Sequence, residues 1–225
     1  MRIHLVSMAI VALASGVPSV ARAQGEPDDR ASSSHVLERG GFSPHVVSDL
    51  RVAMLVRSNS GYFSQASTFG FPIPTTALGF TLGVGVELLP RLSLVATGSY
   101  FGQGATREQY AKLMLTSESL GLDARYAFLR WESAPVMGQI EARLGGGRYW
   151  MRETFTDPLL SSQSFVADGA SLGFSAGLEA SVHVSVFRTV VGYAYHYAPA
   201  TIENRIGGAV HAGGHEISFG FGIRL

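Results

Sequence analysis

Apolar and polar residues alternate with a period of two from about residue 46 onward, which is the pattern of β-strands with one apolar face. Leu82, Val84 and Val86, for example, alternate with glycine and glutamate. The pattern predicts eight strands, over residues 46–58, 75–89, 91–101, 113–130, 136–153, 164–182, 185–198 and 213–225. The expected fold class is therefore all-β, and the run Gly145-Gly146-Gly147 is a candidate position for a β-bulge.

The connections between the predicted strands alternate in length. Four are long (59–74, 102–112, 154–163 and 199–212), and three are short (near 90, 131–135 and 183–184). Long loops at one end and short turns at the other, with an even number of strands, are typical of barrels in the bacterial outer membrane. We therefore expect residues 46–225 to form an eight-stranded antiparallel up-and-down transmembrane β-barrel with both termini in the periplasm.

The N-terminal part of the chain lacks this alternation. An apolar stretch over residues 5–20 is followed by the small-residue cleavage site Ala21-Arg22-Ala23. These features predict a cleaved secretory signal peptide over residues 1–23, and the alternative is a retained membrane anchor. Residues 24–45 are polar and without periodicity, which predicts a flexible periplasmic leader.

Composition indicates which face of the barrel points outward. Only 15% of the residues are charged, and Lys112 is the single lysine, whereas soluble domains have about 25% charged residues. The polar face is mostly Gly, Ser and Thr, which suit the narrow lumen of eight strands. Aromatic residues lie on the apolar face toward the strand ends, where membrane-interface girdles are expected. They are Tyr100, Tyr126, Phe128, Trp131, Tyr193, Tyr195 and Tyr197. These features favour an apolar exterior in lipid over a soluble secreted barrel with an apolar interior.

The last predicted strand carries apolar residues at every second position to its end. They are Ile217, Phe219, Phe221, Ile223 and Leu225. With the strand pattern of residues 46–225, this stretch resembles the small OmpA/OmpX-like outer-membrane β-barrels. The resemblance implies an outer-membrane location, contact with outer-membrane lipids, and an assembly signal in these five residues for the insertion machinery. Leu225 departs from the family, in which an aromatic residue is usual at this position.

Ten charged side chains project into the lumen on the side of the short turns. The acids are Asp49, Glu87, Asp123, Glu141 and Glu179, and the bases are Arg51, Arg125, Arg143, Arg188 and Arg224. An unpaired charge is costly in a poorly hydrated lumen, and a guanidinium group can bind a carboxylate through two parallel hydrogen bonds. We therefore expect these groups to form salt bridges that close the lumen. The alternative is a narrow, porin-like pore in which the charges face water.

Residues 193–199 are similar to the motif of lipid A deacylases (PagL-like), in which a nucleophilic serine follows a histidine by two positions. Only His196 matches, because Ala198 stands at the nucleophile position and alanine cannot attack an ester. The strand pattern also places His196 in the lumen, whereas the catalytic histidine of that family faces lipid. A lipid A-modifying enzyme is therefore a disfavoured alternative, and we expect no enzymatic activity.

Other cofactor chemistry has little support in the sequence. His211 and His215, beside Glu216, are weak metal candidates because the sequence fixes no third ligand. The glycine run 145–147 lacks the lysine of a P-loop. The chain has no cysteine and a formal net charge of zero, so neither disulfides nor nucleic-acid binding are indicated. We expect no cofactor.

Apolar side chains also occur in the predicted outer loops. They are Tyr62, Phe63, Phe69 and Phe71 in the first loop, and Phe155, Pro158, Leu159 and Leu160 in the third. Such residues either bind an extracellular ligand, or they pack on the barrel rim or insert among lipid headgroups. The leading hypothesis is an outer-membrane barrel with a structural or surface-interaction role, and the alternative is a narrow pore for ions or small solutes.

Overall fold

The computed structural model describes residues 44–58, 60–107, 111–156, 164–200, 202 and 210–225. The signal peptide expected over residues 1–23 lies outside the described residues. The same holds for the leader expected over residues 24–45, apart from Pro44 and His45. Both remain predictions.

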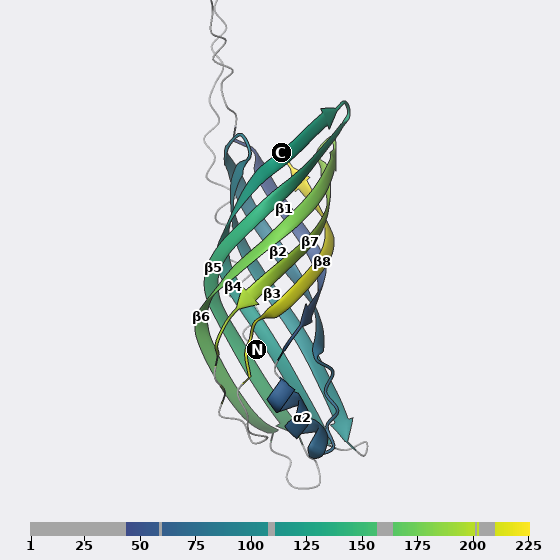
Figure 1. Cartoon of the computed structure of the whole chain (residues 1–225), viewed down its shortest axis with the longest axis vertical. Helices are drawn as coiled ribbons and strands as arrows, with labels where there is room; N and C mark the ends of the chain where they lie inside the picture. The colour runs from purple at the N-terminus through teal and green to yellow at the C-terminus, as the bar shows by residue number, and fades with distance from the viewer. Residues whose placement is uncertain (1–43, 59, 108–110, 157–163, 201, 203–209) are drawn as a thin grey trace, which may run out of the picture. The chain divides into compact units, whose positions relative to one another are not determined.

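Eight antiparallel strands close into a barrel, in which neighbours in sequence are neighbours in space and β8 pairs with β1 (Figure 1). The strands are β1 (Val46–Val56), β2 (Thr76–Leu89), β3 (Leu92–Arg107), β4 (Ala111–Ser133), β5 (Val136–Thr156), β6 (Ser164–Val184), β7 (Phe187–Tyr197) and β8 (Gly214–Arg224). A short helix, α2 (Ser60–Thr68), follows β1. The predicted all-β, eight-stranded up-and-down barrel is confirmed.

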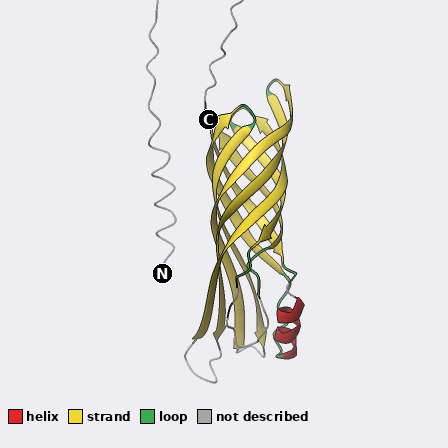
Figure 2. Ribbon diagram, turned by 60° about the vertical axis from the view of Figure 1, so that its left-hand side comes forward, coloured by secondary structure: helices red, strands yellow, loops and turns green. Residues whose placement is uncertain are grey.

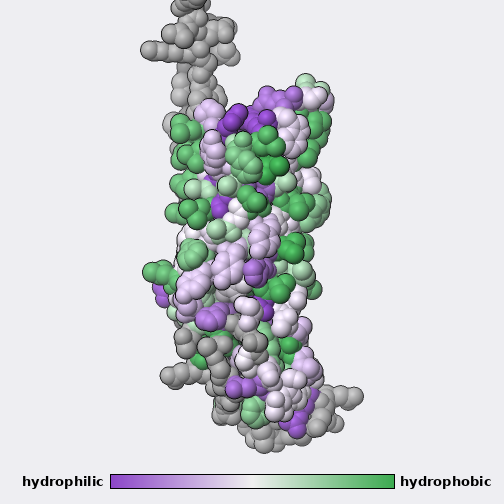
Figure 3. All heavy atoms as spheres, viewed as in Figure 1, coloured by the Kyte–Doolittle hydropathy of each residue, from purple (hydrophilic) through white to green (hydrophobic). Residues whose placement is uncertain are grey.

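Successive side chains of each strand point alternately into the lumen and outward. On β7, Arg188 and Val190 are buried in the lumen, whereas Val191 and Tyr193 are about half exposed on the outer face. Hydrophobic residues cover much of the barrel wall in Figure 3. A closed barrel with a charged lumen and an apolar outer face is the arrangement of an outer-membrane β-barrel, and the protein is a barrel of this type.

The aromatic residues expected in the girdles all lie on the outer face. Each of the seven side chains is between 38% and 50% exposed. The five alternating residues of the expected assembly signal on β8 and at Leu225 also point outward, with Phe221 63% and Leu225 62% exposed. Their positions suit contact with lipid; their roles as girdle and assembly signal remain predictions.

The strands differ in length by a factor of two. β1, β7 and β8 have 11 residues each, whereas β4 has 23 and β5 and β6 have 21 each. A tilted strand needs about 9–11 residues to cross the hydrocarbon core, so β4, β5 and β6 continue about ten residues beyond it. Figure 2 shows strands that project past the rest of the barrel at the end opposite the short turns, and β3 continues beside β4 to Arg107 at this end. We call this part the outer extension and this end the long-loop end.

The expected long loop over residues 102–112 is wrong. β3 continues to Arg107 and β4 begins at Ala111, and the two strands pair up to Arg107 and Ala111. The sequence Gly102-Gln103-Gly104 has no apolar residue, and this hides the alternation on which the prediction depended.

The candidate β-bulge at residues 145–147 is also wrong. These glycines pair in continuous register with β4 and β6, and the register shifts instead between Ala127 and Leu129 on β4 and between Glu87 and Leu89 on β2. A Cβ on Gly145 would clash with Asp123 Oδ1. Glycine at this position therefore allows a lumen carboxylate to approach the β5 backbone.

Candidate functional site

The candidate site is the lumen, which is filled by successive layers of inward side chains. Along β5 these layers follow one another from the short-turn end to the long-loop end: first Glu141 and Arg143, then Tyr149, and then Met151 and Glu153. All five side chains belong to residues that are no more than 7% exposed. We call the layers the charge network, the histidine layer and the apolar plug.

The charge network consists of eight of the ten predicted lumen charges. Its members are Asp49, Arg51, Asp123, Arg125, Glu141, Arg143, Glu179 and Arg188. Four carboxylates therefore meet four guanidinium groups, and the formal charges cancel. None of these side chains is more than 5% exposed, so water contributes little to screening them.

Glu179 is the centre of the charge network. Arg51 donates to both of its carboxylate oxygens, at 2.5 and 3.0 Å. Nη1 of Arg125 and Nη1 of Arg143 each lie 3.5 Å from a Glu179 oxygen, and Nη2 of Arg188 lies 3.8 Å away. One carboxylate on β6 thus joins arginines from β1, β4, β5 and β7 across the lumen.

The remaining pairs complete the network around this centre. Asp49 accepts hydrogen bonds from Arg51 Nε at 2.7 Å and from Arg125 Nη1 at 2.9 Å. Arg143 Nε lies 2.7 Å from Asp123 Oδ2, and Arg188 donates to Glu141. The arrangement brings together side chains that are up to 139 positions apart in sequence.

The other two predicted charges form a separate group at the short-turn mouth. Arg224 donates to Glu87 through Nε at 3.1 Å and Nη2 at 2.7 Å. Arg130, which the sequence pattern did not place in the lumen, lies 3.9 Å from Glu87 and 2.7 Å from Glu132. The register shift between Ala127 and Leu129 reverses the inward and outward positions of β4, so simple alternation fails there.

The histidine layer lies next to the charge network, on the side of the long-loop end. His196 Nε2 is 2.8 Å from Glu216 Oε2, and its Nδ1 is 3.1 Å from the Tyr149 hydroxyl. His196 is 6% and Glu216 is 1% exposed. The pattern placed His196 in the lumen, but it gave no sign of its partners, which come from β8 and β5. Ala198 is buried in the apolar plug.

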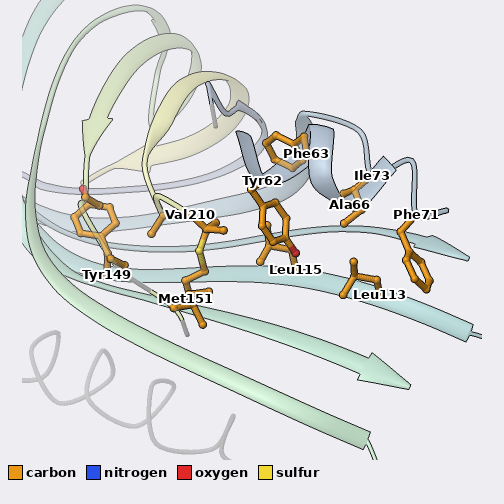
Figure 4. Packing of buried hydrophobic residues seen from close by; sticks show 14 of the residues in the cluster. Tyr62, Phe63, Ala66, Phe71, Ile73, Leu113, Leu115, Tyr149, Met151 and Val210 are labelled. Carbon is orange, nitrogen blue, oxygen red and sulfur yellow. The ribbon is translucent and has the colours of Figure 1, made fainter. Parts of the chain in front are cut away.

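The apolar plug fills the lumen toward the long-loop end. Its members are Tyr62, Phe63, Ala66, Phe71, Ile73, Ala111, Leu113, Leu115, Tyr149, Met151, Ala198, Ala200, Ile202, Val210 and Ala212. Figure 4 shows Tyr62 and Ala66 on α2 beside Leu113 and Leu115 on β4. The helix and its apolar side chains therefore close the lumen from the outer side.

The first loop, which connects β1 to β2, therefore does not present a surface of exposed aromatic residues. Tyr62, Phe63 and Phe71 are buried, and of the four loop residues only Phe69, 54% exposed, faces solvent. Phe155 packs edge-to-face on Phe71, whereas residues 158–160 lie outside the described residues. The rim-packing alternative holds for the buried residues.

Two polar contacts anchor the plug. The Tyr62 hydroxyl donates a hydrogen bond to Glu153 at 2.5 Å, and Arg57 Nη2 donates to Ser117 Oγ at 2.5 Å. Burial of Tyr62, together with the neighbouring Glu153 carboxylate, raises the pKa of the Tyr62 hydroxyl. The phenol therefore stays protonated and keeps its role as a donor. The sequence singled out Tyr62 as a loop aromatic, but it gave no sign of the contacts with Glu153 and Ser117, which form only when the strands and the loop pack together.

Two small cavities remain between the layers. One, of about 10 Å³, is bounded by residues of the charge network and the short-turn mouth. The other, also of about 10 Å³, is lined by Asp123, Arg143, Tyr149, Ser175 and His196. Each volume is about that of a single water-sized occupant.

The weak metal candidates do not converge. His215 points outward and stacks on Tyr193, whose hydroxyl lies 2.8 Å from its Nδ1, whereas Glu216 points into the lumen. His211 is exposed. Within the described part of the chain, no three His, Asp or Glu side chains are grouped so that they could hold a metal ion. The described helix is not long enough to cross a membrane.

No protein-family model and no curated protein matches the chain. Solved structures with a similar barrel include Ail, the attachment invasion locus protein of Yersinia pestis, in complex with the heparin analogue sucrose octasulfate. It is 14% identical with a TM-score of 0.47, covering 81% of this chain and 97% of that chain. Neisserial surface protein A is 18% identical with a TM-score of 0.41, covering 81% and 96%. The N-terminal β-barrel domain of Pseudomonas aeruginosa OprF is 14% identical with a TM-score of 0.39, covering 80% and 97%. The likeness concerns the barrel alone.

Proposed function

We propose that the protein is a closed outer-membrane barrel with a structural or surface-interaction role. The observation that carries this proposal is the charge network, in which Glu179 is within 4 Å of four arginines from four different strands. Ion pairs that cross a lumen of eight strands occupy the space that a solute would need.

The apolar plug supports the same conclusion from the other side. Hydrated ions cross an apolar region only at high cost, and Leu113, Leu115 and Val210 are fully buried in the plug. An ion on the path through the barrel would have to displace α2 and then break the charge network.

The outer extension is the part available for interactions outside the membrane. The pairing of β6 with β7 begins at Phe174 and Tyr197, so within the described chain residues Ser164–Gly173 pair on one side only, with β5. Val166 is 54% and Leu172 is 80% exposed on this segment. An unpaired strand edge with exposed apolar side chains can accept an extended segment of an extracellular partner.

Orientation follows from the same proposal. The short turns and the C-terminus face the periplasm, and the long-loop end faces the outside. Residues 1–23 are removed on export, and residues 24–45 form a periplasmic leader. The outward apolar residues of β8 contact the insertion machinery during assembly and outer-membrane lipids afterwards.

Single cysteines test this orientation without interference, because the chain has none of its own. Val166→Cys lies on the outer extension, Ser133→Cys lies at the short turn after β4, and both positions are exposed. On intact Gram-negative cells that express the protein, a membrane-impermeant maleimide should label Val166→Cys. It should label Ser133→Cys only after the outer membrane is permeabilised.

Leu144→Cys provides the matched control on the apolar wall. Leu144 is 65% exposed and pairs with Ala124 on β4 and Ala176 on β6. This part of the wall lies between the outer extension and the short turns. This cysteine should remain unlabelled in both conditions because lipid covers it. Labelling of Ser133→Cys but not Val166→Cys on intact cells would refute the proposed orientation, and labelling of neither would refute surface display.

A further inference from the structure

The cavity at the short-turn end is bounded by both the charge network and the mouth. Arg125 and Arg188 line it from the network, and Glu87 and Arg224 line it from the mouth. Its volume of about 10 Å³ accommodates one occupant of about the size of water. The charges and hydrogen-bonding groups of the lining residues then decide which occupant is favoured.

Positive charges outnumber negative charges around the cavity. The charged or titratable residues of its lining are Arg91, Arg125, Arg188, Arg224, His183, Glu87 and Glu141. Glu87 accepts two hydrogen bonds from Arg224 and Glu141 accepts one from Arg188, so two of the four guanidinium groups are paired within the lining. Arg125 pairs with Asp49 just outside the lining, so the exposed Arg91 is the surplus positive charge, and the local potential favours an anion over a cation.

Buried donors among the same residues lack acceptors. His183 is 3% exposed, and its Nε2 lies 3.2 Å from Ser181 Oγ. If Ser181 donates to Nε2, the imidazole proton is on Nδ1, which has no hydrogen-bond partner among the described residues. Nε and Nη2 of Arg125 and Nε of Arg188 are also buried without an acceptor in the described chain. Donors left in this state are costly, so an additional acceptor is favoured.

We propose that this cavity binds a single halide ion, with chloride as the natural occupant. A water molecule would add two O–H donors to a site that already has too many, whereas a halide only accepts hydrogen bonds. A volume of about one water-sized occupant favours a monatomic anion over sulfate or phosphate. The ion would be held by His183 and by the N–H groups of Arg125 and Arg188 that have no other acceptor among the described residues.

Bromide locates such a site directly. Crystals of the wild-type protein grown in sodium bromide should show an anomalous scattering peak in the cavity beside His183. The absence of this peak, with ordinary solvent density in its place, would show that the cavity holds water and would overturn the proposal.

A stability measurement tests the same site in solution. The temperature at which the folded band disappears on heat-modified gels should rise saturably with sodium chloride, relative to sodium gluconate at equal ionic strength. Gln139→Glu places a carboxylate at a buried position in the cavity lining, and it should abolish the difference between chloride and gluconate. Gln65→Glu makes the same change at an exposed position on α2, and it should retain the difference. Equal wild-type midpoints in the two salts, or a full chloride effect in Gln139→Glu, would contradict halide binding.

Discussion

Replacement of Glu179 by alanine is expected to destabilise the folded barrel by about 3–5 kcal/mol, the usual cost of removing one partner from a buried ion pair. Glu179 is 1% exposed and lies within 4 Å of Arg51, Arg125, Arg143 and Arg188. Its loss leaves four buried guanidinium groups with three carboxylates. The temperature at which the folded band is lost on gels should therefore fall markedly, and Arg125→Ala and Glu141→Ala should lower it as well.

Glu132→Ala is the matched control for this prediction. Glu132 also pairs with an arginine, Arg130, but its side chain is 64% exposed. Exposed pairs contribute about 0–1 kcal/mol, so this variant should melt close to the wild type. Equal melting temperatures for Glu179→Ala and Glu132→Ala would show that the loss of Glu179 does not destabilise the barrel, and this would contradict a stabilising role of the charge network.

Truncation of Leu115 to alanine is the second large effect. Leu115 is fully buried in the apolar plug. Removal of a buried leucine side chain costs about 2–5 kcal/mol through lost burial and the cavity that remains. The loss should appear as a lower midpoint of urea unfolding in detergent micelles, and it would place α2 and the outer extension within the cooperatively folded structure.

Met114 supplies the adjacent control. It precedes Leu115 on β4 but points outward and is 48% exposed. Met114→Ala should change stability by no more than about 0.5 kcal/mol, as is usual for surface substitutions. If Leu115→Ala unfolds at the same urea concentration as Met114→Ala, the plug does not contribute to the stability of the barrel.

The barrel was predictable because its physical causes are written in local sequence. Alternation at Leu82, Val84 and Val86 requires two different environments on the two faces of a strand. Small polar residues on one face indicate a narrow lumen, and the absence of abundant lysine indicates an exterior that is not in water. These features together determined eight strands and the inward direction of all ten lumen charges.

The contents of the lumen were less predictable because they depend on residues that meet only after the barrel closes. Alternation places His196 inside, but its pairing with Glu216 and Tyr149 depends on the register of three strands. Arg130 was missed because an irregular register reverses the direction of its side chain. α2 was missed because nine residues in a loop form a helix mainly through the packing of Tyr62 and Ala66 in the lumen.

The outer end of β3 was predicted too short for a related reason. Outside the membrane neither face of a strand must be apolar, so the alternation weakens while the pairing continues. Gly102 and Gly104 on β3, for example, pair with Thr116 and Met114 on β4. Hydrophobic patterning therefore missed the outer end of β3, although it predicted most of the length of β4, β5 and β6.

Single-channel recording of the refolded protein in a planar bilayer tests the closed lumen most directly. The same sample should first show the heat-dependent gel shift of a folded barrel, so that an absence of channel openings cannot be due to misfolded protein. The charge network and the apolar plug predict a bilayer with no steady openings. Repeated openings of uniform size would contradict the closed lumen and would make the same charges the lining of a narrow, selective pore.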